Sequence, residues 1–194
     1  RFPVSGGAAH VSQAFGDAPV HIHSAGQAAL ETGDFFTTWA NRYDSDMPRT
    51  STHGLSEGDV FPLGEGEVVV VHLPGHTNDG LGFHLPHLST LVVGALLPRA
   101  DRPTRWDLPG GSLLDVVKSL KRIRRMKLSS LVPLQGPAIR GTDHVKDVLD
   151  RHLRFYEEAV QNDGRPPTSW ERPASTAVWL TPRTPWPLEE QESV

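Results

Sequence analysis

His76 is the residue at which this sequence could place a metal ligand or a general base. It follows Pro74 and Gly75 in the turn "LPGHTNDG", directly after the valine run at residues 68–71. Functional groups of α/β folds usually follow the carboxyl ends of strands, so this turn would deliver an imidazole to the edge of a sheet. Neutral imidazole is a common ligand for zinc and iron. A catalytic zinc site generally uses about three protein ligands, so His76 alone does not make one.

Other residues could join His76 or contact a substrate beside it. Asp79 follows in the same turn and His53 lies in "TSTHGLSEGD", and either could reach the rim of a cleft. His21 and His23 project to the same face of a predicted strand, a spacing that metal ligands use and that also arises by chance among ten histidines. His76 has two interpretations: it hydrogen-bonds its own turn, or it is a functional imidazole.

The absence of cysteine narrows the chemistry further. It excludes thiolate zinc sites, disulfides and cysteine nucleophiles, and it suits the cytosol. There is no G-x-S-x-G nucleophile motif, and the glycine-rich pieces lack a P-loop lysine.

Four short segments resemble, in order along the chain, the metal motifs of the metallo-β-lactamase fold superfamily. The turn at residues 74–77 is similar to the family's third metal motif, Pro-Gly-His-Thr. The family's Gly-Asp corresponds to Gly94 and Ala95, and its later Pro-Gly-His-Gly-Pro turn corresponds to residues 133–137, "PLQGP". Upstream, the family's H-x-H-x-D-H-x-G-G motif aligns with residues 1–7, of which the two glycines match.

The resemblance implies that most metal ligands are lost. The first motif histidine falls before residue 1, and the other aligned ligand positions hold Arg1, Pro3, Val4, His76, Ala95 and Gln135. Ala95 is the most damaging change, because the family's aspartate at that position bridges two metals. We therefore expect no cofactor, with zinc or iron bound only if ligands from outside the family's set join His76. Asp79, His53 and Gln135 are then candidate substrate-binding residues, with His76 as the candidate catalytic residue.

The resemblance also implies a mixed α/β fold, an αββα sandwich of two sheets with helices outside. We expect this domain to span residues 1–162, followed by an irregular Pro- and Trp-rich extension at residues 163–194 in which "TAVWLT" could form an edge strand. The family usually begins with several strands before the first metal motif, and these are absent here. An upstream segment, a partner protein or a second copy in a homodimer would then cover the exposed sheet face.

Patterns in the sequence predict the elements that position these residues. Two strands flank the glycines at residues 64–66, and a short buried strand lies in "LSSLVPLQGPAI". A helix at residues 112–126 begins at Ser112, with Asp115 three residues later and apolar side chains on one face. A second helix is capped by Thr142, and its apolar positions include His152 and Tyr156.

Charge and hydropathy limit the partners. The net charge of −4 offers no overall attraction for nucleic acid or for an anionic membrane. No apolar run approaches the roughly 18 residues of a membrane span. We therefore predict a cytoplasmic protein that binds no membrane and that is not expected to bind nucleic acid, with a small-molecule ligand in the cleft as one option.

Three functional hypotheses follow. The first is a pseudoenzyme that acts as a binding or structural module, since ordinary dinuclear zinc hydrolysis is not expected without the ligand set. The second is a hydrolase, lyase or cyclase, metal-independent or hydrolase-like, that acts on a small ester, thioester or lactone with His76. The third is a binder of an acidic partner or of RNA through the basic helix at residues 118–127, whose cations also suit an ordinary solvated face.

Overall fold

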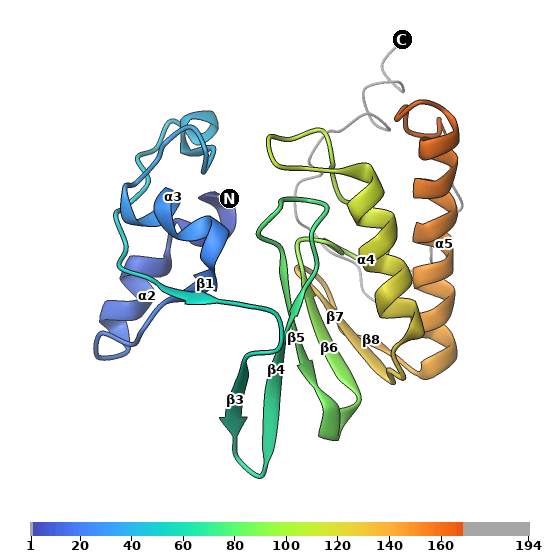
Figure 1. Cartoon of the computed structure of the whole chain (residues 1–194), viewed down its shortest axis with the longest axis horizontal. Helices are drawn as coiled ribbons and strands as arrows, with labels where there is room; N and C mark the ends of the chain where they lie inside the picture. Colours follow the sequence, from blue (N-terminus) through green and yellow to red (C-terminus); the bar gives the residue numbers. More distant parts are fainter. Residues whose placement is uncertain (1, 169–194) are drawn as a thin grey trace. The chain divides into compact units, whose positions relative to one another are not determined.

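The structure, a computed structural model, describes residues 2–168 in two compact units that meet in the sequence between Asp59 and Val60 (Figure 1). The predicted domain limits, residues 1–162 and 163–194, stay a prediction. Most of the predicted extension, including "TAVWLT", lies outside the described residues.

The first unit, residues 1–59, contains short helices and one pair of strands. Its elements are α1 (Phe2–Ser5), α2 (Ala8–Ala14), β1 (His21–His23), the 3-10 helix η1 (Ser24–Gly26), α3 (Gln27–Glu31), the 3-10 helix η2 (Ala40–Tyr43) and β2 (His53–Leu55). Strands β1 and β2 are parallel, with His21 opposite His53. A small core of Leu30, Ala40 and Met47 holds the unit together.

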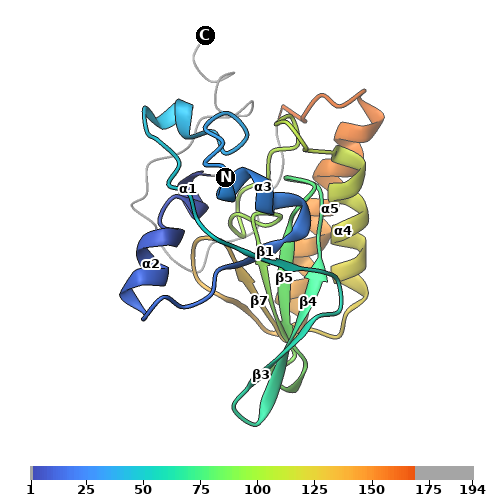
Figure 2. The same ribbon diagram turned by 60° about the vertical axis from the view of Figure 1, so that its left-hand side comes forward.

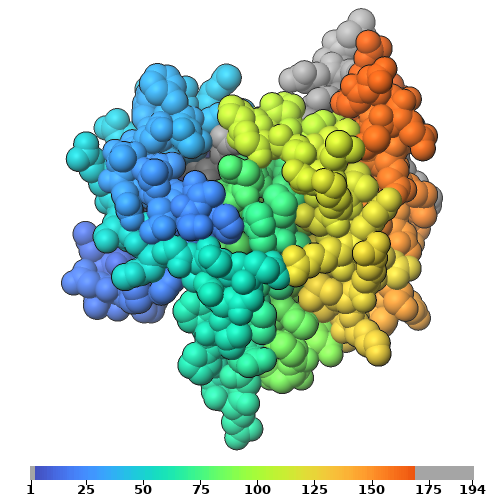
Figure 3. All heavy atoms as spheres, viewed as in Figure 1, coloured from blue at the N-terminus to red at the C-terminus, as the bar shows by residue number. Residues whose placement is uncertain are grey.

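The second unit is built on a six-stranded sheet. Its strands lie in the order β3 (Val60–Leu63), β4 (Gly66–His72), β5 (Leu81–Leu85), β6 (Thr90–Gly94), β7 (Ser130–Pro133) and β8 (Ile139–Arg140). The 3-10 helix η3 (Pro86–Leu88) joins β5 to β6. All neighbouring strands are antiparallel except β6 and β7, which are parallel. As predicted, β3 and β4 form a hairpin around the glycines at residues 64–66, and the tip of this hairpin projects beyond the other strands (Figures 1 and 3).

Two long helices cover one face of this sheet. Helix α4 (Leu113–Arg125) connects β6 to β7, as a parallel pair requires, and α5 (Thr142–Gln161) follows β8. The helices lie side by side in both ribbon views and in contact in the space-filling view (Figures 1, 2 and 3). These sheets and helices confirm the predicted mixed α/β class.

The sequence predicted an N-cap for each of the two helices, and the structure confirms one of them. The Ser112 hydroxyl accepts the Asp115 N–H at 3.2 Å, so the predicted cap of α4 is confirmed. The predicted cap of the second helix by Thr142 is wrong: Thr142 is the first helical residue, the N-cap is Gly141, and no side chain caps this end. The hydroxyl of Thr142 therefore lies one residue too late to act as an N-cap.

The core of the second unit lies between the sheet and the two helices. Its fully buried side chains include Leu91, Val93 and Leu131 from the strands, Val116, Leu120 and Ile123 from α4, and Val148, Phe155 and Tyr156 from α5. The α4 residues recur at intervals of four and three, which places them on one helix face. No helix within residues 2–168 has the length and hydropathy to cross a membrane.

His152 is a polar member of this core. Its ring is fully buried, its Nε2 donates to the Ala100 carbonyl at 2.8 Å, and it stacks on Tyr156 with ring centroids 6.3 Å apart. Burial lowers the pKa of His152 to about 4, although the bond to Ala100 and the charge of Asp101 act in the opposite direction. The imidazole is therefore neutral in the folded protein at neutral pH.

The buried His152 predicts a loss of stability in acid. The unfolded chain takes up this proton near pH 6.5 and the folded protein only near pH 4, so folding stability is complete above about pH 6.5 and declines as the pH falls toward 4. The full loss from this group is about 3 kcal/mol. In urea unfolding, the wild type should lose about 2 kcal/mol more than His152→Leu between about pH 7 and pH 4.5.

A matched control removes a different histidine of the same helix. The side chain of His144 is only partly buried, so His144→Gln should keep the acid dependence of the wild type. Equal losses in the wild type and in His152→Leu would show that His152 does not cause the acid sensitivity.

Candidate functional site

Three of the segments that resemble family motifs meet at one edge of the six-stranded sheet. Strands β4 and β6 run in the same direction because β5 is antiparallel to both, and β7 is parallel to β6. Their carboxyl ends therefore share an edge, and His76, Ala95 and Gln135 follow those ends. Backbone bonds join two of the segments: the Gln135 N–H donates to the Pro98 carbonyl at 2.9 Å.

The turn that carries His76 is fixed against the start of α4. The Ser112 N–H donates to the Gly75 carbonyl at 2.9 Å, and the Ser119 hydroxyl donates to the Pro74 carbonyl at 2.7 Å. Gly75 has a φ of 143°, and a Cβ atom there would lie 2.7 Å from the Cα of Val116. Only glycine allows this approach, so the Pro-Gly pair sets where His76 stands.

The ring of His76 is held at Nδ1 by two acceptors. Nδ1 lies 3.1 Å from the Arg105 carbonyl and 3.1 Å from the Thr104 Oγ1, whose own proton goes to the Ala95 carbonyl at 2.7 Å. A carbonyl only accepts, and the Thr104 hydroxyl has already donated, so Nδ1 carries the proton of the neutral ring. The lone pair is then on Nε2, which is the arrangement of an imidazole oriented as a base or as a metal ligand.

Thr104 is fixed in turn by Tyr156 of α5. The buried Tyr156 hydroxyl accepts the Thr104 N–H and donates to the Thr104 carbonyl at 3.3 Å. Burial raises the pKa of Tyr156, so this hydroxyl stays protonated and able to donate. The indole of Trp106 packs edge-on against the Tyr156 ring, with centroids 5.6 Å apart. A chain of hydrogen bonds thus connects the helical core to His76.

No side chain of the predicted substrate-binding residues takes part in this hydrogen-bond network as the structure describes it. Asp79 is partly buried in the same loop as His76, and its carboxylate makes no hydrogen bond or ion pair with residues 2–168. Gln135 is exposed. His53 belongs to the first unit, where its ring lies 5.3 Å from that of His21. Their roles stay predictions.

Sequence reasoning missed the residues that orient His76. Thr104 and Arg105 lie in an irregular segment with no motif, and Tyr156 was predicted only as an apolar position of a helix. Thr104 is 28 residues from His76 and 52 from Tyr156. No local pattern signals contacts over such separations.

The side chains that the structure describes do not form the ligand set of the family's metal site. Among residues 2–168, no three or more His, Asp or Glu side chains gather where they could hold an ion. At the shared edge, His76 offers one imidazole, Ala95 offers only a methyl group, and Gln135 offers a neutral amide. One imidazole is fewer ligands than any catalytic zinc site uses.

Comparisons with known proteins correct the expectation of no cofactor. The chain is similar to the protein in the crystal structure of TTHA1623 in a di-iron-bound form, with 28% identity and a TM-score of 0.59 over 72% of this chain and 68% of that one. A relative of this fold therefore binds iron, and the prediction that no cofactor belongs here is contradicted. The aligned positions that lack a metal ligand give information about those positions only, and not about whether the protein binds a cofactor.

Two curated relatives match parts of the chain. An uncharacterized protein of Aquifex aeolicus is 42% identical over 69 residues, which are 36% of this chain and 32% of that protein. The acyl-coenzyme A thioesterase MBLAC2 of Gallus gallus is 28% identical over 148 residues, which are 68% of this chain and 50% of the thioesterase. The chain thus spans between a third and a half of these relatives.

The family and the fold are both established by further matches. A metallo-beta-lactamase superfamily protein of Sulfolobus tokodaii, ST1585, shares the fold with a TM-score of 0.60 at 15% identity, over 75% of this chain and 60% of that one. The sequence model of the metallo-beta-lactamase superfamily matches residues 5–135, more than half of the chain, and includes the turn of His76. This chain therefore belongs to the metallo-beta-lactamase superfamily.

Proposed function

We propose that the chain is a pseudoenzyme of this superfamily, a binding or structural module that keeps the scaffold without the family's hydrolytic reaction. One observation carries the proposal: the three positions aligned with family ligands at this edge hold one imidazole, His76, a methyl group at Ala95 and an amide at Gln135. The contacts that hold the His76 ring involve Thr104 and the Arg105 carbonyl and do not use the side chains of Ala95 or Gln135.

Hydrolysis by this family depends on how the protein activates a water molecule. A metal hydrolase lowers the pKa of a bound water from about 16 toward 7, and it does so with several protein ligands and an open position. The described residues supply one such ligand. A site with one such ligand would leave an attacking water with a pKa near that of the bulk solvent, and hydrolysis there would be slow.

Thioester hydrolysis tests this proposal, because a relative is named as an acyl-coenzyme A thioesterase. The full chain, incubated with zinc or with ferrous iron, should release thiol from an acyl-coenzyme A at less than about twice the buffer rate. Thiol release would be followed with a chromogenic disulfide. Turnover that a chelator abolishes would overturn the pseudoenzyme proposal.

The geometry of His76 favours a second candidate. With the proton on Nδ1, Nε2 is the ring nitrogen that carries the lone pair and can accept a proton. A positioned general base is worth about 10²- to 10⁴-fold in rate. Together with the likeness to a thioesterase, this supports a hydrolase, lyase or cyclase that acts on a small thioester, ester or lactone.

Replacement of His76 separates the two candidates. If the second holds, His76→Gln should lower kcat/KM at least about 100-fold, because the variant has no base at this position. His87→Gln is the matched control, because His87 is exposed on η3, before the opposite end of β6, and it should leave the rate unchanged. Activity that survives in His76→Gln would remove this candidate.

A further inference from the structure

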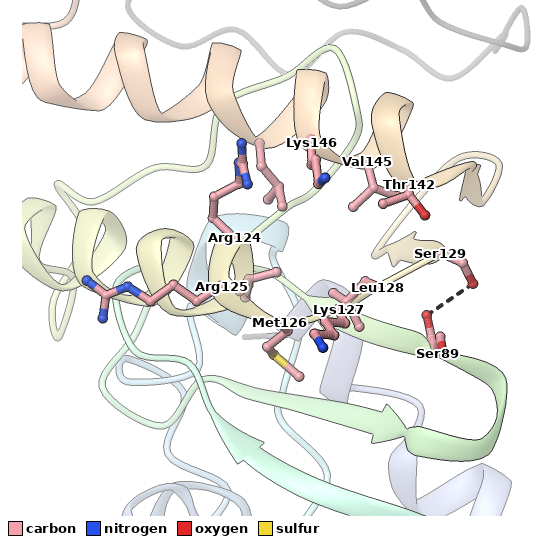
Figure 4. A pocket seen from close by; sticks show the side chains of 12 residues that line it. Ser89, Arg124, Arg125, Met126, Lys127, Leu128, Ser129, Thr142, Val145 and Lys146 are labelled. Carbon is pink, nitrogen blue, oxygen red and sulfur yellow. Dashed lines mark hydrogen bonds between the residues drawn. The ribbon is translucent and has the colours of Figure 1, made fainter.

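A second feature lies at the other edge of the six-stranded sheet, away from His76. A hollow of about 480 Å³ opens between the end of α4 and the start of α5. Ser89 and Ser129, which directly precede β6 and β7, line its floor, so it marks the amino-terminal ends of these parallel strands (Figure 4). Its volume lies within the range of small-molecule sites.

The lining of the hollow carries four cations and no carboxylate. The four are Arg124, Arg125, Lys127 and Lys146. Arg124 is neutralised by two hydrogen bonds to Asp150, at 2.7 and 3.1 Å. The ammonium groups of Lys127 and Lys146 are exposed and make no ion pair or hydrogen bond with other side chains of residues 2–168. The hollow therefore holds an uncompensated positive charge.

The lysines on the earlier turns of α4 are paired with carboxylates, unlike those in the hollow. Lys118 pairs with Asp115 at 3.2 Å, and Lys121 pairs with Glu157 at 2.7 Å. The positive charge predicted along residues 118–127 is thus largely balanced on the earlier turns of α4. The positive charge that no carboxylate balances is concentrated at the carboxyl end of α4.

The helix dipole does not account for this concentration. Cations in the last turn of α4 are favoured by its carboxyl end, which explains Arg124 and Arg125. Lys127 lies beyond the helix, and Lys146 lies in the amino-terminal half of α5, where the dipole does not favour a cation. In Figure 4, Lys127 and Lys146 stand on opposite walls of the hollow, while Arg125 extends away from both.

We propose that this hollow binds the phosphate groups of a small phosphorylated ligand. Lys127 and Lys146 would contact a diphosphate from its two sides, with the Thr142 hydroxyl as a further donor. A small ligand fits better than RNA, because the unpaired cations are confined to one hollow and form no continuous track. The proposal is independent of the proposed function, since its residues lie at the opposite edge of the sheet.

Calorimetric titration of the full chain with inorganic pyrophosphate tests the proposal. The double variant Lys127→Gln/Lys146→Gln should weaken binding at least about 10-fold, because it removes the two unpaired cations. The matched control Lys118→Gln/Lys121→Gln removes the same charge from the same region outside the hollow, and it should change the affinity less than about 2-fold. Lys127→Arg/Lys146→Arg should retain binding, which separates lost charge from a damaged fold.

Three results would overturn the proposal. The first is no binding of pyrophosphate up to about 5 mM at low salt. The second is equal weakening in both glutamine double variants, which would indicate a general charge effect. The third is a short single-stranded RNA that binds through Lys127 and Lys146 while pyrophosphate does not, which would assign the surface to nucleic acid.

Discussion

The hydrogen bonds that run from Tyr156 through Thr104 to His76 are the constraint on which the candidate site depends. The buried phenol holds both backbone groups of Thr104, and the Thr104 hydroxyl is shared between the His76 ring and the Ala95 carbonyl. The Thr104 hydroxyl has already donated its proton and the Arg105 carbonyl can only accept, so the proton of the neutral His76 ring lies on Nδ1. A core helix thereby sets the tautomer of a side chain at the edge of the sheet.

This network explains how the scaffold keeps its form while ligand side chains are absent. The position of His76 comes from Gly75 against Val116 and from the carbonyls of neighbouring segments, none of which involves the side chains at positions 95 and 135. The two edges of the sheet then differ in character. One holds an oriented imidazole, and the other holds a hollow with unpaired lysines.

Sequence reasoning recovered what depends on local pattern. The periodicity and cap of α4, the hairpin around residues 64–66, and the family of the His76 turn were all predictable, because each is encoded within a few residues. The Thr142 cap was wrong because a shift of one residue separates an N-cap from a first helical position. The contact between Thr104 and Tyr156 was not predictable, since only packing brings them together. The expectation of no cofactor was wrong because it extended a statement about a few aligned positions to the whole chain, whereas a relative with the same fold is di-iron-bound.

The most direct test of this account is the tautomer of His76, measured by nitrogen-proton correlation NMR on uniformly labelled protein at a pH where the ring is neutral. The account predicts the proton on Nδ1 in the wild type, with the Nε2 resonance at the shift of an unprotonated nitrogen. A proton on Nε2, or rapid exchange between the two nitrogens, would contradict the claim that Thr104 and Arg105 orient this imidazole.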